Sequence, residues 1–468
     1  APSPPALPLI GHLHHLAKFA DNPWDGFDSF RKRYGNVVSL QLGDKRCILV
    51  SSFAAIKEVL ITRGDVFANR PDFSRYLLIF GGDRENSLAL CDWSELQRFR
   101  RQIAQLAIIP RYGSDLYQYL ESCIILDVNE LISNMLNDGK EVLTKLDVLT
   151  MCYNIFTNYL CSQRFCTKDE EFRRQAHGFD FVFYDINQCY ASDFISSLSK
   201  IGVARSHWNL VKKVCIELRY GSKLRDGNDE QLPQDFLDTV LDHHINNPKA
   251  FDWTTCHFEI GDLLGGHSAV GNLLMRLLGH LAVDEKAQEM ILDEARAALN
   301  SQSEKCVRLC HRPKMPFTEA SIMETLRIAS SPIVPHIATE DTKLQEYDVD
   351  KGTMILFNSY HLNTSTDYWE EPQAFNPKRF LVVDENDSNS YRINKPEIYF
   401  PFSFGKRACL GYKMVSVITF AAVANIVLNF VISASLEDQI KIKEQLRAKG
   451  SLALHFDQCF DVILTARK

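Results

Sequence analysis

The sequence predicts a mainly α protein, in which one large helical domain carries a small β-rich region. Helical periodicity dominates residues 115–300. Strand-like segments lie on either side of that helical mass, at about residues 36–70 and 335–400. Hydrophobic residues make up 46% and charged residues 24% of the 468-residue chain, as is typical of globular proteins. Disordered and fibrous classes are therefore excluded.

The N-terminal segment is rich in proline, which lacks the backbone N–H that a helix needs. We expect residues 1–20 to form a stiff hinge behind a removed membrane anchor, and residues 21–468 to form a single domain. Residues 36–50 alternate around a polar turn at Gly43, which predicts a hairpin. The other expected elements are helices over 92–109 and 318–329, strands over 335–362 with a turn at Gly352, and a C-terminal hairpin over 451–466.

The stretch from Met414 to Ala434 contains 21 residues without a charge, which is long enough to cross a bilayer. Polar residues interrupt this stretch, and it lacks flanking basic clusters and aromatic belts. We therefore expect a buried core helix here.

Charge and cysteine content narrow the class further. The formal net charge is −7, so the chain has no overall attraction for nucleic acid, and we expect no nucleic-acid partner. The 13 cysteines are an odd number and form no C-x-x-C pair. This pattern favours a reducing compartment with free thiols.

Residues 401–411 carry the clearest chemical signal, because they place one cysteine between two glycines directly before the uncharged stretch. A thiolate at a helix N-terminus is stabilised by the helix dipole and by free backbone N–H groups. Gly405 and Gly411 let the backbone turn sharply beside a flat ligand, and Arg407 offers a planar fork to a carboxylate. Cys409 is therefore the candidate metal ligand.

This loop carries a family resemblance. Phe402, Gly405, Arg407, Cys409 and Gly411 match the haem-binding pattern F-x-x-G-x-R-x-C-x-G of the cytochrome P-450 family at every position. The resemblance implies the cytochrome P-450 fold over a single catalytic domain, and haem b whose iron is ligated by the Cys409 thiolate. It also implies a monooxygenase that depends on NADPH and dioxygen.

Two further segments match the family in the expected order. Glu324 and Arg327 match its E-x-x-R helix, and their spacing puts both charges on one helix face. Arg379 matches the arginine of the family's P-x-R-F segment. By resemblance these three residues form a buried structural triad that holds the haem loop.

The resemblance also names candidates for binding the haem propionates. Trp93 matches a tryptophan that reaches a propionate, and His336 lies where the family often has another donor. The arginine that usually follows the tryptophan by four residues is Gln97 here. We expect Arg98 or Arg100 to substitute for it.

The helix expected over residues 256–281 departs from the family pattern of small residue, glycine, any residue, acid, threonine. Gly265 and Gly266 are present, whereas the acid is Ser268 and the threonine is Ala269. The usual acid–alcohol pair that delivers protons during oxygen activation is therefore missing. Its replacement is Ser268, ordered water or a hydroxyl group of the substrate.

Two other interpretations of this segment remain. His267 could move protons, but at 100° per residue it faces away from position 269, so we expect a packing or surface residue. Residues 266–269 begin like the nucleophile elbow of a serine hydrolase with Ser268 as nucleophile. The elbow's final glycine is one place late, and the residues before it have a helical period rather than a strand pattern.

Two stretches, residues 86–94 and 265–273, resemble the arthropod members of the family that make ecdysteroid hormones. That resemblance implies a sterol substrate and an early oxidation of 7-dehydrocholesterol. The alternative within haem chemistry is an isomerase or dehydratase that uses no reductase, since some family members lacking the threonine work that way.

The resemblance implies three partners: NADPH–cytochrome P-450 reductase, a sterol, and the cytoplasmic face of the endoplasmic reticulum membrane through the removed anchor. Lys406, Arg407, Lys413 and the cluster 98–101 supply a basic face for the reductase. By position in the chain, we expect the substrate pocket to be lined from residues 73–90, 185–200, 260–272, 332–337 and 456–459.

Overall fold

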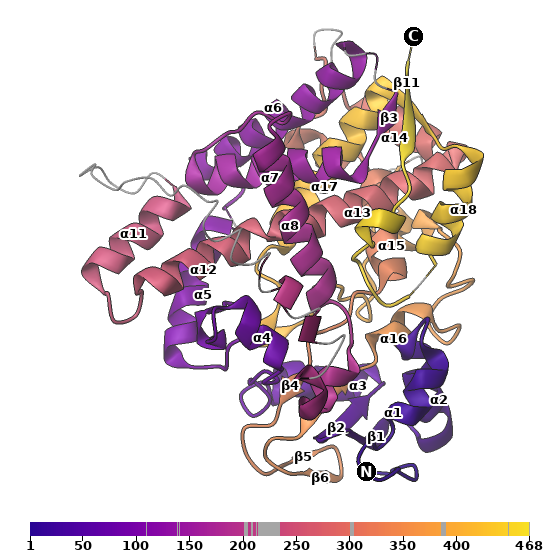
Figure 1. Cartoon of the computed structure of the whole chain (residues 1–468). Coiled ribbons are helices and arrows are strands. Elements are labelled where there is room, and N and C mark those ends of the chain that lie inside the picture. The colour runs from indigo at the N-terminus through magenta and orange to yellow at the C-terminus, as the bar shows by residue number, and fades with distance from the viewer. Residues whose placement is uncertain are drawn as a thin grey trace.

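The computed structural model describes residues 1–108, 110–137, 139, 141–200, 205–206, 209–211, 213, 235–299, 304–384, 390–447 and 449–467. A helical mass occupies most of the molecule, and a small sheet lies at the end that holds the N-terminus (Figure 1). The predicted mainly α class with a small β region is confirmed.

The longer helices are α2 (Pro23–Tyr34), α5 (Glu95–Ile108), α6 (Asp115–Asn137), α7 (Lys145–Cys161), α8 (Glu170–Ile186), α11 (Phe236–Asn246), α12 (Trp253–Leu264), α13 (Gly266–Ala282), α14 (Glu285–Ala298), α15 (Pro316–Ala329), α17 (Tyr412–Asn429) and α18 (Leu436–Gln445). Short helices are α1 (Leu13–Leu16), α3 (Phe53–Lys57), α4 (Ser74–Ile79), α9 (Ala191–Phe194) and α16 (Ser359–Thr364). Single turns of tighter or wider helix include Glu58–Thr62 and Gly405–Arg407.

The main sheet has the strand order β1-β2-β7-β4, formed by β1 (Val37–Leu42), β2 (Lys45–Val50), β7 (Met354–Phe357) and β4 (His336–Ile337). The predicted hairpin over 36–50 is confirmed as the antiparallel pair β1–β2. Its turn requires glycine, because Gly43 has φ +53° and a Cβ there would lie 2.2 Å from the Phe194 carbonyl oxygen. The parallel pair β2–β7 joins the two β-rich parts of the chain.

The small hairpins lie outside this sheet. They pair β5 (Thr342–Leu344) with β6 (Tyr347–Val349) and β8 (Leu381–Val383) with β9 (Tyr391–Ile393). A second sheet has the order β10-β11-β3, formed by β10 (Phe430–Ser433), β11 (Val462–Ala466) and β3 (Val142–Leu143).

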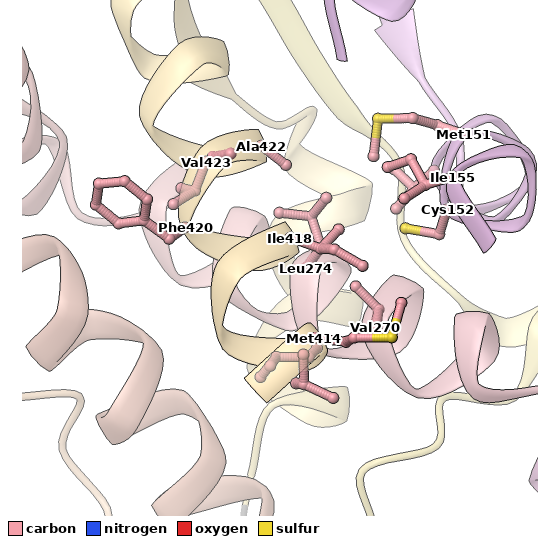
Figure 2. Packing of buried hydrophobic residues seen from close by; sticks show 14 of the residues in the cluster. Met151, Cys152, Ile155, Val270, Leu274, Met414, Ile418, Phe420, Ala422 and Val423 are labelled. Carbon is pink, nitrogen blue, oxygen red and sulfur yellow. The ribbon is translucent and has the colours of Figure 1, made fainter. Parts of the chain in front are cut away.

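Helix α17 lies in the main core, where it packs against α13, α14 and α6. Figure 2 shows Met414 and Ile418 of α17 beside Val270 and Leu274 of α13, with Met151 of α7 to the upper right. Within the described residues, α17 is the one helix long and apolar enough to cross a bilayer, and most of it is buried inside the protein. The prediction of a core helix is confirmed, although the helix ends at Asn429 and the chain continues as β10.

Two expected elements are wrong. Residues 451–466 do not form a hairpin, because β11 pairs with β10 and β3 instead of folding back on its own neighbours. The strands expected to extend to residue 362 stop at Phe357. The chain then turns into α16, which Asn358 caps by accepting from the His361 N–H.

The proline-rich N-terminal segment is packed against the main sheet. Ser39 N–H donates to the Pro2 carbonyl, and Gly11 forms a β-bridge with Leu42. The buried imidazole of His12 lies within hydrogen-bonding distance of the Pro4 carbonyl, with Nε2 at 2.9 Å. Residues 2–12 therefore cover one edge of β1.

A buried ion cluster connects α15 to the segment that precedes the loop of residues 401–411. Glu324 accepts two bonds of 2.8 Å from Arg327, and one of 3.0 Å from Arg379 Nε. Glu324 and Arg327 are fully buried. Trp369 covers both guanidinium groups, at 5.1 and 5.9 Å from its ring centre. The contacts expected within this triad are present.

We expect Glu324→Ala to lower the free energy of unfolding by about 3–5 kcal/mol, because it leaves two guanidinium groups without their carboxylate in the interior. Urea unfolding of the purified protein measures this loss. The matched change Glu171→Ala removes an exposed pair with Arg174 and should cost less than ~0.5 kcal/mol. If the two variants lost the same free energy of unfolding, the buried triad would contribute no more to stability than an exposed ion pair.

Candidate active site

The loop before α17 is held in a shape that only glycine allows. Gly405 has φ +72°, and a Cβ there would lie 2.0 Å from the carbonyl oxygen of Leu60. Cys409 N–H donates to the Phe402 carbonyl at 3.0 Å, which closes the loop. Gly411 then begins α17 as its N-cap. The loop therefore delivers the cysteine to the first turn of a rigid core helix.

The Cys409 side chain faces a large cavity from the N-terminus of α17. Burial raises the pKa of its thiol. The backbone N–H groups of Gly411 and Tyr412 and the nearby charge of Arg101 act in the opposite direction, because they stabilise the thiolate. Burial is the larger effect in the free protein, and the N–H groups and Arg101 would stabilise the thiolate once a metal binds.

The cavity has a volume of about 850 Å³, within the range of sites that bury a ligand of drug size or larger. Residues of four of the five expected ranges line it, and those of 456–459 do not. The largest group of lining residues outside the expected ranges comes from α7, α8 and the segment between them, including Tyr153, Phe156, Phe165, Phe172, Phe179 and Phe183. The lining is mainly apolar and aromatic.

The break between α12 and α13 forms one wall of this cavity. Gly265, Gly266 and Ala269 line it, as their assignment to the oxygen-side helix requires. Ser268 is fully buried, and it is absent from the lining; its Oγ has no hydrogen-bond partner within the described residues. The structure therefore does not place Ser268 where it could pass a proton to a group in the cavity.

His267 and the serine-hydrolase alternative are both resolved by packing. His267 is fully buried among Tyr153, Phe156 and Phe179, with Nδ1 2.7 Å from the Leu264 carbonyl. Burial lowers its pKa to about 4, so it stays neutral. A helix, α12, precedes Ser268 where a nucleophile elbow needs a strand.

Three guanidinium groups line the cavity without a carboxylate partner in the described part of the chain: Arg70, Arg101 and Arg407. Their recorded hydrogen bonds go to backbone carbonyls, such as Ala408 for Arg101 at 2.7 Å and Ala68 for Arg407 at 2.9 Å. Burial and the charge of Arg407 lower the pKa of Arg70 to about 9 and that of Arg101 to about 10. An anionic ligand would relieve this repulsion.

Two polar atoms beside these arginines also lack a partner among the described residues. They are Nη1 of Arg407 and Nε2 of His336, and both are buried. His336 Nδ1 lies 2.6 Å from the Phe67 carbonyl, so the ring orientation is fixed. Burial and the charge of Arg70 hold the pKa of His336 well below its usual range. The Phe67 carbonyl can only accept, so Nδ1 carries the proton of the neutral ring and Nε2 is an acceptor. Nε2 becomes a donor when the ring takes up a second proton, which a carboxylate beside it would favour.

Some sequence-predicted contacts fall elsewhere. Arg98 is exposed and pairs with Glu95, whereas Arg100 is buried beside Glu259, so neither lines the cavity. Trp93 lies just before α5 and is also absent from the lining; its ring packs 5.2 Å from the Arg407 guanidinium. Trp93 therefore acts on the cavity only through Arg407.

Sequence reasoning missed Arg70, and it placed Arg101 on the basic face for the reductase, whereas Arg101 lines the cavity. Helix phase contained a signal for Arg101, because it follows Gln97 by four residues and so lies one turn further along the same face. Arg70 lies in the segment between the main sheet and α4, and no pattern in the sequence pointed to it.

The donor set fits haem b. A thiol supported by N–H groups can ligate iron, and the unpaired arginines and imidazole match the carboxylates of two propionate groups. Phe402 and Gly411 also line the cavity, next to Cys409. These residues would hold the flat ring between the loop and the wall formed by Gly266 and Ala269.

Comparison with known proteins agrees with this geometry. Residues 1–455 match the family described as Cytochrome P-450. The chain is 36% identical over its whole length to Cytochrome P-450 307a1 of Drosophila melanogaster, known as Spook, and covers 89% of it. It is 26% identical to Cytochrome P-450 1A1 of Sparus aurata over 88% of this chain and 81% of the relative. It is 25% identical to human Cytochrome P-450 2U1 over 85% and 73%.

We expect Arg101→Gln to speed haem loss by about tenfold, because a charged hydrogen bond to a carboxylate contributes about 1.5–3 kcal/mol. Transfer of haem to an excess of apomyoglobin, followed by absorbance, measures the rate. The control Arg98→Gln removes an exposed cation from the same helix and should leave the rate unchanged. Faster loss from Arg98→Gln, with none from Arg101→Gln, would return the assignment to Arg98.

Proposed function

This chain belongs to the cytochrome P-450 family, whose members are monooxygenases that bind haem b through a cysteine thiolate, and we propose that it oxidises an apolar sterol with Cys409 as the iron ligand. We further propose that the reaction is an early oxidation of 7-dehydrocholesterol in ecdysteroid hormone biosynthesis. The resemblance of residues 86–94 and 265–273 to the arthropod ecdysteroid enzymes supports this substrate, as does the similarity to the Drosophila relative.

The observation that carries the proposal is one large apolar cavity that Cys409 and the aromatic residues of α7 and α8 share. A rigid hydrocarbon skeleton gains free energy by leaving water for such a lining. The cavity is large enough for a flat cofactor at the Cys409 end and a ligand beyond it.

Each residue of the site has a role that its position supports. Bound haem supplies insertion of an oxygen atom from dioxygen, with electrons from NADPH. Cys409 would hold the iron, and the N–H groups of Gly411 and Tyr412 would stabilise the thiolate form that ligates it. Arg70, Arg101, Arg407 and His336 would bind the propionates. Glu324, Arg327 and Arg379 join α15 to the segment that precedes the cysteine loop in sequence, and they touch no reacting group.

Proton delivery is where this chain departs from its family. Ala269 carries only a methyl group on the cavity wall, and Ser268 faces the protein interior. Gly265 and Gly266 leave room on the same wall. We propose that water admitted there, or a hydroxyl group of the substrate, supplies the protons that the missing threonine would relay.

Electron delivery uses NADPH–cytochrome P-450 reductase in this proposal. Three cations are exposed near Cys409 in the chain or on α5. Lys406 lies in the cysteine loop, Lys413 lies in the first turn of α17, and Arg98 lies on α5. Arg407 is buried and does not belong to that face. Charge complementarity steers an acidic reductase domain to such a surface. We place the reaction at the cytoplasmic face of the endoplasmic reticulum membrane.

The second candidate is a haem-thiolate isomerase or dehydratase that works on an oxygenated substrate without a reductase. Ala269 favours it, since such a reaction needs no proton relay for dioxygen. The two candidates differ in their need for NADPH.

We expect the haem-loaded protein to convert 7-dehydrocholesterol only when NADPH and the reductase are both present, because oxygen insertion requires two electrons from outside the substrate. Product analysis by mass spectrometry, with NADPH consumption recorded in parallel, measures this. Conversion of an oxygenated sterol without NADPH would support the isomerase instead. Binding and turnover of neither sterol would overturn the substrate proposal.

A further inference from the structure

One carboxyl group lies on the cavity wall where its neighbours are apolar. Asp262 of α12 lines the cavity together with Phe80, Leu88 and Phe258. Its Oδ2 accepts hydrogen bonds from the Leu88 N–H at 2.8 Å and from the Ser87 hydroxyl at 3.0 Å. Both bonds end on the same oxygen, and Asp262 is partly exposed on the cavity wall, so Oδ1 can accept a further hydrogen bond from a molecule in the cavity.

The carboxyl group of Asp262 would cost free energy if a ligand filled the cavity without hydrogen bonding to it. Burial raises the pKa of Asp262 to about 7, although the N–H groups of Leu88 and Ala89 and the Ser87 hydroxyl lower it. A polar atom that faces an apolar cavity loses water when a hydrophobic ligand fills it. The ligand that belongs here must therefore bring its own hydrogen-bonding group to Asp262.

The position of Asp262 on α12 indicates which end of the ligand carries the polar group. Asp262 precedes Ala269 by seven residues, a distance of about 10 Å along a regular helix, with the break at Gly265 between them. Both residues line the cavity. A polar group held at Asp262 therefore leaves the far part of a rigid ligand beside Gly266 and Ala269, where the reaction would occur.

The surroundings of Asp262 decide between a neutral and a cationic polar group. Phe80, Leu88 and Phe258 lie beside it on the cavity wall. An ammonium group held there would lose its hydration, whereas a hydroxyl group carries no charge and can donate to Oδ1. The match is an apolar molecule with one hydroxyl group.

We propose that Asp262 is a specificity-determining residue that accepts a hydrogen bond from the hydroxyl group of the substrate, at the end of the ligand remote from the reacting carbon. The proposal rests on the proposed function, because a sterol is an apolar skeleton with one hydroxyl group at its end. Anchoring of the loop 87–90 accounts for the two bonds to Oδ2, and the ligand contact accounts for the other oxygen.

The test uses haem-loaded protein titrated with 7-dehydrocholesterol and with the same hydrocarbon lacking its hydroxyl group, with the Soret shift as readout. The quantity of interest is the ratio of the two dissociation constants. We expect the natural protein to bind the hydroxylated sterol at least about tenfold more tightly, as when a buried polar group would otherwise lose its hydrogen-bond partner. In Asp262→Leu the ratio should fall to near one.

A control separates the contact from a disturbance of the loop. Ser87→Ala removes one bond to Oδ2 and keeps the carboxyl group, so it should weaken both sterols alike and preserve the ratio. An unchanged ratio in Asp262→Leu, with both sterols still bound, would overturn the role of Asp262 and leave the sterol proposal standing. Absence of a Soret shift with either sterol in the natural protein would overturn both.

Discussion

The first turn of α17 is the constraint on which the rest of the site depends. Its N–H groups at Gly411 and Tyr412 point to the Cys409 sulfur, and the helix behind them is buried along most of its length. The loop that reaches this turn closes only because Gly405 adopts a left-handed conformation against Leu60. A cysteine placed by a core helix and a glycine turn can hold a metal without moving.

The charges around the cavity complete the same design. Arg70, Arg101 and Arg407 are held by backbone carbonyls rather than by acids in the described chain. Buried cations kept together without counter-charges destabilise the empty protein. Their arrangement is understandable if the site is built around a ligand that carries two carboxylates. Folding and cofactor binding are then coupled, since the ligand supplies the missing negative charge.

Local sequence patterns predicted the elements whose signals are local, and failed where partners are distant. The sequence predicted both the turn at Gly43 and the uncharged core helix correctly. The expected C-terminal hairpin over 451–466 was wrong, because β11 pairs with β10 and β3, which tertiary packing brings beside it. The helix α16 is six residues long and escaped notice for lack of periodicity.

The same contrast holds within the site. The family pattern identified Cys409, because ligand, glycines and arginine lie within eleven residues. Gln97 stands where the family has a propionate-binding arginine, so the sequence did not show which arginine takes that role. Arg98 and Arg100 are its neighbours in sequence, but they lie on other faces of α5. Asp262 carried no sequence signal, because an isolated aspartate on a helix is usually solvated. Only the structure shows that this carboxyl group lines the cavity.

The most direct measurement of the central claim is the difference spectrum of the reduced protein with carbon monoxide. A thiolate opposite the bound gas should give a band at about 450 nm in the natural protein. We expect Cys409→Ser to abolish that band, and Cys166→Ser, which alters another exposed cysteine of the same cavity, to keep it. An unchanged band in Cys409→Ser would contradict the account.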